Sequence, residues 1–173
     1  GKEYKLLDKN FPTIDPKKPY ALTKEEEDIM ERLERAFENC EKLQRHMHFL
    51  LNKGGLYKVY NGNLLYHGCV PLKEDGNLKS VRIFGRAYKG KGLYEVLESY
   101  VRKGFYAMDP KEKERGKDIM WYIWLSENSP LFGKDKMATF ERYFLAEKET
   151  HKEKKNPYYL LLEDEKVVEK ILK

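Results

Sequence analysis

The residue of this chain best placed to do chemistry is His67, which stands beside Gly68 at the end of an apolar, aromatic run. Similar runs lie on both sides of Asn61-Gly62, and this dipeptide readily takes the positive φ values of a type I′ turn. The stretch 56–72 therefore predicts a β-hairpin whose second strand ends at His67. An imidazole at that position could bind a metal or a phosphate, although an ordinary edge histidine is the simpler interpretation of the local sequence.

Two other groups of residues are weaker candidates for chemistry. The basic loop 89–92, Lys-Gly-Lys-Gly, precedes a predicted helix, and glycines and lysines before a helix N-terminus can hold an anion. It lacks the spacing and the Lys-Ser/Thr pair of a P-loop, so a plain loop is the simpler interpretation. His46 and His48 lie two positions apart on a predicted helix, where they cannot share a metal from one face.

The composition indicates one folded domain with a solvated, ion-paired surface. The chain has 173 residues, of which 40% are hydrophobic and 36% charged, and its net charge is only +5. The only support for a nucleic-acid-binding function is the isoelectric point of about 8.9, and that support is weak. Two cysteines, Cys40 and Cys69, are too few for a disulfide framework, and no apolar run could cross a bilayer. We therefore expect a cytoplasmic protein.

The order of elements predicts an α+β fold: an extended arm at 1–20, followed by a single α/β piece at 21–173. Thr23 and Glu26 form a capping-box pattern that opens one long helix from 23 to 52 with a single apolar face. The apolar run 119–125, which contains Trp121 and Trp124, is expected to be deeply buried. The remaining patterns predict a strand at 80–84 that continues past Gly85, helices at about 93–105, from 109, at 137–146 and at 163–173, and a short buried strand at 157–162.

Two segments resemble the class III fructose-1,6-bisphosphatases of Firmicutes. They are 64–72, with the sequence LLYHGCVPL, and 129–144, with the sequence SPLFGKDKMATFERYF, and the similarity extends over essentially the whole chain. These enzymes belong to the calcineurin-like metallophosphoesterases. The resemblance therefore implies part of an αββα sandwich, with a small antiparallel sheet and several helices.

The resemblance also implies a reaction, the hydrolysis of fructose 1,6-bisphosphate to fructose 6-phosphate and phosphate in gluconeogenesis. It makes His67 a ligand of a two-metal centre that uses manganese, where the metals lower the pKa of a bridging water and clamp the phosphate. Lys134, Lys136 and Arg142 become candidates to neutralise substrate phosphates, with ordinary surface charge as the alternative. No general acid, base or nucleophile can be named from the sequence.

The other metal-ligand motifs of the superfamily are absent from the chain: Asp-x-His, Gly-Asp-x-x-Asp, Gly-Asn-His and a later Gly-His. Because one ligand cannot assemble a two-metal centre, we expect an internal fragment of the phosphatase that is inactive by itself. Its expected partners are the sugar bisphosphate, the rest of its own chain and a second copy, but neither nucleic acid nor a membrane. The alternative is a non-catalytic interaction or oligomerisation module that uses the helix 23–52.

Overall fold

The computed structural model describes residues 1–173 and confirms the α+β class. It contains seven α-helices, one 3-10 helix and two antiparallel hairpins. The helices are α1 Lys24–Glu38, α2 Glu41–Lys53, α3 Gly90–Tyr106, α4 Pro110–Leu125, α5 Thr139–Phe144, η1 Lys148–His151, α6 Tyr158–Leu161 and α7 Glu165–Leu172. The strands are β1 Tyr57–Tyr60, β2 Asn63–Tyr66, β3 Val81–Ile83 and β4 Arg86–Tyr88. Neither sheet exceeds two strands, so the implied αββα sandwich is not itself visible in this chain.

The first hairpin forms as predicted. Strands β1 and β2 pair antiparallel, with Tyr57 opposite Tyr66. The turn places Asn61 at φ 49° and Gly62 at φ 74°, the signs that a type I′ turn requires. The strand therefore delivers His67 at its end, as the spacing indicated.

The second hairpin corrects a prediction, because the strand at 80–84 does not continue past Gly85. The chain instead reverses at Phe84 (φ 44°) and Gly85 (φ 85°), and β3 pairs with β4. A non-glycine residue at positive φ is strained. Contact of the Phe84 ring with Tyr100, at 4.9 Å between centroids, offsets part of that cost.

The centre of the molecule is the pair of helices α3 and α4, which approach most closely at two glycines. A Cβ at Gly116 would collide with the backbone of Gly104, so only glycine permits this separation. The second hairpin, α3 and α4 enclose one apolar cluster. The segment 69–72, α3, α6 and α7 enclose a second, and the first hairpin packs against it. Their buried members are Val81, Ile83, Leu93, Leu97, Ile119 and Ile123 in the first cluster, and Cys69, Val70, Leu72, Tyr94, Tyr158 and Val167 in the second.

The prediction of one long helix from 23 to 52 is wrong, because the chain forms two helices there, α1 and α2, with a break between them. The capping box is present: the Thr23 hydroxyl accepts from the Glu26 N–H, and the Glu26 carboxylate accepts from the Thr23 N–H. The break comes at Asn39, whose side-chain amide donates to the carbonyl of Arg35 at 2.8 Å. Such a local hydrogen bond competes with helix continuation, and Cys40 then takes an extended conformation.

Two further expectations about burial and local structure are wrong. The apolar run 119–125 forms the end of α4 rather than a buried block, and Trp121 and Trp124 stack on each other in solvent, 59% and 62% exposed. Only one face of this helix meets α3, so consecutive apolar residues cannot all be covered. The segment 157–162, predicted as a strand, instead contains the helix α6. A short apolar run does not by itself distinguish a buried strand from a buried helix.

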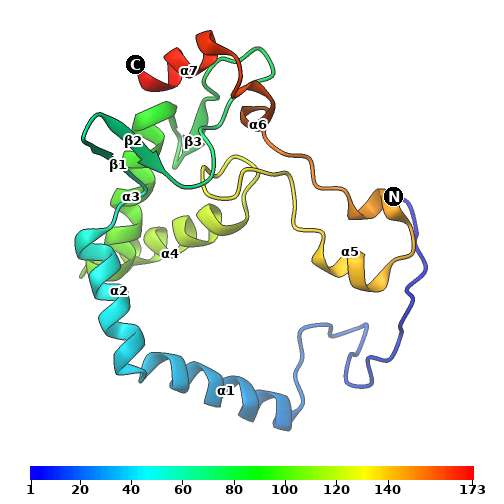
Figure 1. Ribbon diagram of the computed structural model, residues 1–173. Helices are drawn as coiled ribbons and strands as arrows, with labels where there is room; N and C mark the ends of the chain where they lie inside the picture. The colour runs from blue at the N-terminus through cyan, green and yellow to red at the C-terminus, as the bar shows by residue number, and fades with distance from the viewer.

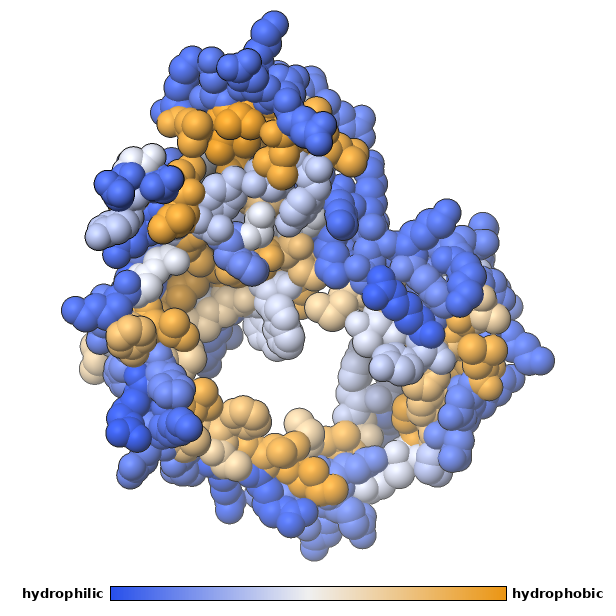
Figure 2. Space-filling model, viewed as in Figure 1, coloured by the Kyte–Doolittle hydropathy of each residue, from blue (hydrophilic) through white to orange (hydrophobic).

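The first 53 residues form an arc that stands away from the rest, which we call the body (residues 56–173). Figure 1 shows α2 leaving the body, α1 crossing below it and the N-terminal arm returning beside α5. The ring closes where the Leu7 N–H donates to the Phe144 carbonyl at 2.8 Å. Figure 2 shows the opening through this ring, with apolar residues along its rim over α1. No helix combines the length and the apolar character needed to cross a membrane.

The arc leaves the molecule with far more surface than a compact protein. A compact monomer of 20.6 kDa exposes about 8,900 Å² by the usual size scaling, whereas this chain exposes 13685 Å². Of all the buried residues, only Leu51 belongs to the arc, and α1 buries none. The body is therefore packed and the arc is not.

Candidate functional site

The two segments that resemble the phosphatases lie directly against each other in the structure. The Cys69 N–H donates to the Pro130 carbonyl at 2.7 Å. Gly68, at φ 86°, allows this approach, because a Cβ there would collide with the same carbonyl oxygen. The residue after His67 is thus a glycine for a physical reason, and the contact holds His67 beside the 129–136 loop.

Asn156 joins a third segment to this junction. Its side chain is buried, and its Oδ1 accepts from the Leu72 N–H at 3.1 Å and from the Tyr158 N–H at 3.0 Å. Its own N–H donates to the Gly133 carbonyl at 2.9 Å. One amide side chain and its backbone therefore hold together three segments that are far apart in sequence.

His67 itself is exposed at the edge of this junction. It lines an open pocket of about 570 Å³ together with Lys53, Lys58 and Leu131. The two lysines give this surface a positive character around the imidazole. The neighbouring Cys69 is fully buried, and burial raises the pKa of its thiol to about 11, so the thiol is protonated at neutral pH.

The residues of this chain do not by themselves fit a metal centre. No group of three or more His, Cys, Asp or Glu side chains lies close enough together to hold an ion. His67 supplies one imidazole, and a two-metal centre needs several further ligands. Any such centre would have to draw its other ligands from outside these 173 residues.

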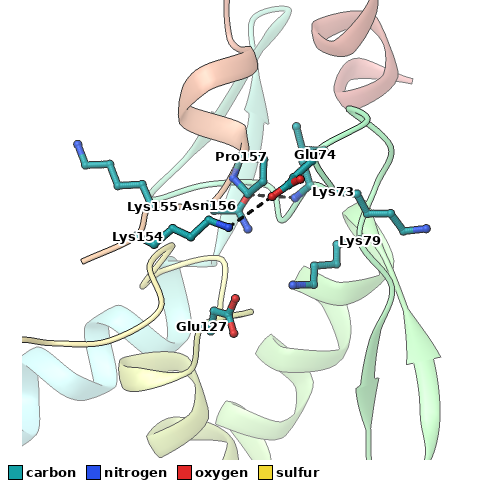
Figure 3. Close-up of a pocket in the computed structure, with 9 residues that line it drawn as sticks. Lys73, Glu74, Lys79, Glu127, Lys154, Lys155, Asn156 and Pro157 are labelled. Atoms are coloured by element: carbon teal, nitrogen blue, oxygen red, sulfur yellow. Dashed lines mark hydrogen bonds and ion pairs between the residues drawn. The ribbon is translucent and has the colours of Figure 1, made fainter. Parts of the chain in front are cut away.

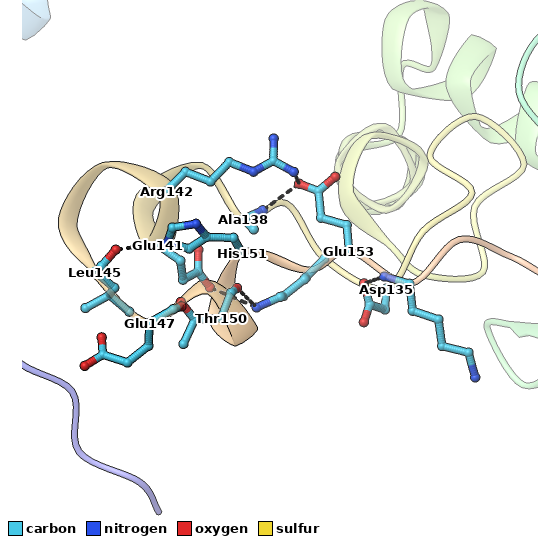
Figure 4. A network of polar contacts seen from close by, with 11 residues as sticks. Asp135, Ala138, Glu141, Arg142, Leu145, Glu147, Thr150, His151 and Glu153 are labelled. Atoms are coloured by element: carbon cyan, nitrogen blue, oxygen red, sulfur yellow. Dashed lines mark hydrogen bonds and ion pairs between the residues drawn. The ribbon is translucent and has the colours of Figure 1, made fainter.

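Two of the three basic candidates, Lys134 and Arg142, share one acidic partner, Glu153, and Figure 4 shows the pair that it forms with Arg142. Lys134 pairs with Glu153 at 2.7 Å, and Arg142 pairs with the same carboxylate at 3.4 Å. The Ala138 N–H also donates to Glu153, at 2.8 Å. The hydrogen bonds from Lys134 and Ala138 lower the pKa of Glu153 to about 2, so this carboxylate is ionised at any physiological pH.

Lys136 is held in the same region by a different carboxylate. It pairs with Glu141 at 3.3 Å and donates to the Thr150 carbonyl at 2.7 Å. Each of the three basic candidates therefore already has an acidic partner, and no hydrogen bond or ion pair links them to His67. A substrate phosphate would have to compete with Glu153 or Glu141 for them, and their role in binding stays a prediction.

The sequence singled out neither Asn156 nor Glu153, although both organise the site. Glu153 sits in a mixed-charge run that looks like an ordinary solvated excursion, and Asn156 precedes a proline in the same run. Their importance comes largely from distant residues: Leu72 lies 84 positions from Asn156, and Lys134 and Ala138 lie 19 and 15 positions from Glu153. No local pattern carries that information.

Comparison with known proteins identifies the kind of chain in which this junction occurs. A family model described as Firmicute fructose-1,6-bisphosphatase matches residues 1–173. The curated relatives carry the name fructose-1,6-bisphosphatase class 3. A relative from Clostridium botulinum (strain Loch Maree / Type A3) is 55% identical over 167 residues, which is 96% of this chain and 25% of that protein. No solved structure matches.

Relatives from other genera agree with this match. One from Listeria innocua serovar 6a is 52% identical over 99% of this chain and 26% of its own length. One from Clostridioides difficile (strain 630) is 56% identical over 95% of this chain and 25% of its own length. The chain belongs to the Firmicute fructose-1,6-bisphosphatase family, as the two motif segments indicated, and it spans about a quarter of the length of the curated relatives it matches.

Proposed function

We propose that this chain is part of a phosphoric monoester hydrolase that converts fructose 1,6-bisphosphate to fructose 6-phosphate and phosphate, a reaction of gluconeogenesis. The observation that carries the proposal is the family match over the whole chain, residues 1–173. The packing of 64–72 against 129–136 supports it, because both segments that resemble the family meet at one place.

In this proposal His67 is one ligand of a manganese centre that is completed by other parts of a longer polypeptide. Neutral imidazole suits Mn²⁺ alongside carboxylates, and two such ions would supply an activated water and neutralise phosphate charge. The contribution of this chain is to position the imidazole, which the Gly68–Pro130 contact does, and to surround it with positive charge. Free Cys40 and Cys69 are compatible with a reducing cytoplasm, where we place the enzyme.

The proposal also explains which polypeptide would pack against the exposed arc. The excess surface exceeds the roughly 1,600 Å² that a standard protein interface buries, so it calls for extensive contacts. The rest of the phosphatase polypeptide is the occupant we propose, with a second copy of the enzyme as a further source of contacts. We expect these contacts above all on the apolar face of α1, where Ile29, Leu33 and Phe37 are exposed.

The direct test is phosphate release from fructose 1,6-bisphosphate with added manganese. These 173 residues are compared with a longer polypeptide of the family that contains them. Activity only in the longer polypeptide supports the proposal, and His67→Ala in it should then abolish the activity. His46→Ala, which changes an exposed histidine on α2, is the matched control and should have no effect. Equal activity of both chains would mean that the site is complete within these residues.

A second candidate function, a non-catalytic interaction module, is favoured by one observation: α1 is amphipathic and buries none of its residues. It predicts self-association or partner binding that is lost on polar substitution of Leu33 and Phe37, with no effect of metal. Absence of phosphatase activity from both the short and the longer polypeptide would favour it over the enzyme.

A further inference from the structure

The arc joins the body through residues 54–56, which we call the hinge. They lie between the end of α2 at Lys53 and the start of β1 at Tyr57, and the first two of them are Gly54 and Gly55. Figure 1 shows this end of α2 beside α3, the helix at the centre of the body. Because glycine has more backbone freedom than any other residue, two in succession leave the direction of the arc undefined unless side chains fix them.

Two side chains of α3, Glu98 and Arg102, hold the backbone of the hinge and of the helix end before it. The guanidinium of Arg102 donates to the Leu51 carbonyl in the last turn of α2 and, at 3.1 Å, to the Gly54 carbonyl. The carboxylate of Glu98 accepts from the Leu56 N–H at 3.1 Å. Leu51 is also the only buried residue of the arc, so this is the place where the arc packs against the body.

The two side chains also hold each other. Arg102 donates twice to one oxygen of Glu98, from Nη2 at 2.7 Å and from Nε at 3.2 Å, which leaves the second oxygen for Leu56. The side chains of Arg102 and Glu98 are 37% and 27% exposed, against 73% and 64% for the Arg35–Glu31 pair of the same spacing on α1. The guanidinium also lies at the negative end of the α2 dipole, where carbonyls lack helical partners. This pair therefore has more contacts and less solvent around it than an ordinary surface ion pair.

The hinge is also one wall of the His67 pocket. Lys53 and the whole hinge, residues 54–56, line the same open pocket as His67. After the hinge the chain enters β1, where Tyr57 lies opposite Tyr66, the residue before His67. A shift of the hinge therefore moves both a lysine of the pocket and the strand pair that carries the imidazole.

Other contacts between α3 and α2 hold the helix but do not bond the hinge. The Tyr106 hydroxyl donates to Asn52 Oδ1 at 3.1 Å. The ring of His48 lies edge-on to that of Phe105, with 5.0 Å between the centroids. Removing one of these contacts therefore separates the loss of an α2 contact from the loss of the bonds to the hinge.

We propose that Glu98 and Arg102 are positioning residues for the His67 pocket and that they act by locking the hinge between the arc and the body. Neither residue lines this pocket, so both act through the backbone that they bond. The lock also couples the pocket to the arc, because a displacement of α2 reaches the bonds of Arg102 first. Its consequence for phosphate release rests on the proposed function of His67, whereas its consequence for the order of the hinge does not.

The first experiment measures amide hydrogen exchange of the longer polypeptide on peptides that cover residues 51–60 and 90–106. Arg102→Gln should speed exchange in 54–58 by about tenfold, the effect of losing charge-assisted hydrogen bonds, while α3 keeps its rate. Glu98→Gln, which has nearly the same shape and keeps an acceptor oxygen, should act in the same direction and decides the question if Arg102→Gln fails to fold. Tyr106→Phe is the control and should leave the hinge unchanged. Unchanged exchange in both glutamine variants, or an equal increase in Tyr106→Phe, would overturn the proposal.

The kinetics of phosphate release separate positioning from general stability. In Arg102→Gln, kcat should fall by about tenfold while KM changes by less than about twofold, because a positioning residue alters the geometry of the site rather than the contacts that bind substrate. Tyr106→Phe should keep the full kcat. An unchanged kcat in a variant with faster hinge exchange would overturn the positioning role. An inactive parent polypeptide would instead refute the proposed function, and hydrogen exchange would still decide whether the lock exists.

Discussion

The body and the arc are built from equally regular helices, yet they differ in what covers them. In the body, α3 and α4 meet at Gly104 and Gly116 with no room for a methyl group. In the arc, α1 has a complete capping box and an apolar face but buries no residue. Good local signals are thus enough to define a helix, but they do not supply the tertiary contacts that stabilise one. This contrast is the reason for our proposal that other polypeptide covers the arc.

The largest expected effect is at the contact between the two central helices. Gly116→Ala would drive a methyl group into the Gly104 backbone and should lower the free energy of unfolding by about 3 kcal/mol, measured by urea denaturation. Gly92→Ala is the control: this helical glycine has nothing within 4 Å, so alanine there should be neutral or stabilise by up to about 1 kcal/mol. Similar losses in the two variants would contradict the tight packing of the body.

The next effect is at the motif junction, where two glycines at positive φ form a matched pair. Gly68→Ala adds both backbone strain and a collision with the Pro130 carbonyl, and should cost about 2–3 kcal/mol. Gly62→Ala adds only the strain, since nothing lies near it, and should cost about 1 kcal/mol. Thermal unfolding of both variants separates the two contributions. Equal losses of stability in the two variants would mean that Gly68 does not pack as closely against the Pro130 carbonyl as the structure shows.

These comparisons also show what the sequence could and could not predict. The turn at Asn61-Gly62, the capping box at Thr23 and the start of α4 at Asp109-Pro110 follow from residues within a few positions, and all three were confirmed. The break at Asn39 was missed, because an asparagine that bonds its own helix carbonyl has the same sequence pattern as one that faces solvent. Local signals defined most elements but not how far they extend.

For the candidate site, the sequence indicated His67 and the two motif segments, but not what holds them. The role of Asn156 depends on Leu72, 84 positions away, and no spacing rule could reveal it. The pocket whose lining includes Lys73, Lys79, Lys154 and Lys155 (Figure 3) could not be predicted either, because these lysines come from separate stretches of the chain that individually look like ordinary surface charge.

A smaller effect is expected from the ionic network that links the end of the 129–144 segment to Glu153. The pKa of Glu153 lies near 2 in the folded chain, below its usual value of about 4.5, because Lys134 and Ala138 bond the carboxylate. Its stabilising effect is thus complete above about pH 4.5 and decreases as the pH falls toward 2. Glu153→Gln should lower the melting temperature at neutral pH, less than Gly68→Ala does, and should flatten the decline below pH 4.5. An unchanged acid profile would show that Glu153 does not stabilise the fold through its charge.

The smallest effect is expected in the arc. Leu33→Ala and Phe37→Ala should change the free energy of unfolding of the 173-residue chain by no more than about 0.5 kcal/mol, because the two residues are already 49% and 64% exposed. In a longer polypeptide that covers α1, each should cost about 2–4 kcal/mol. Urea denaturation of both chains measures this contrast. A small cost in both settings would mean that α1 stays uncovered.

The most direct test of the central claim, that further phosphatase polypeptide covers the arc, is amide hydrogen exchange. It compares residues 24–38 of α1 with residues 90–106 of α3, in the 173-residue chain and in the longer polypeptide. We predict that α3 is protected in both, and that α1 exchanges rapidly in the short chain but is protected in the longer one. Rapid exchange of α1 in both chains, or equal protection in both, would contradict the account.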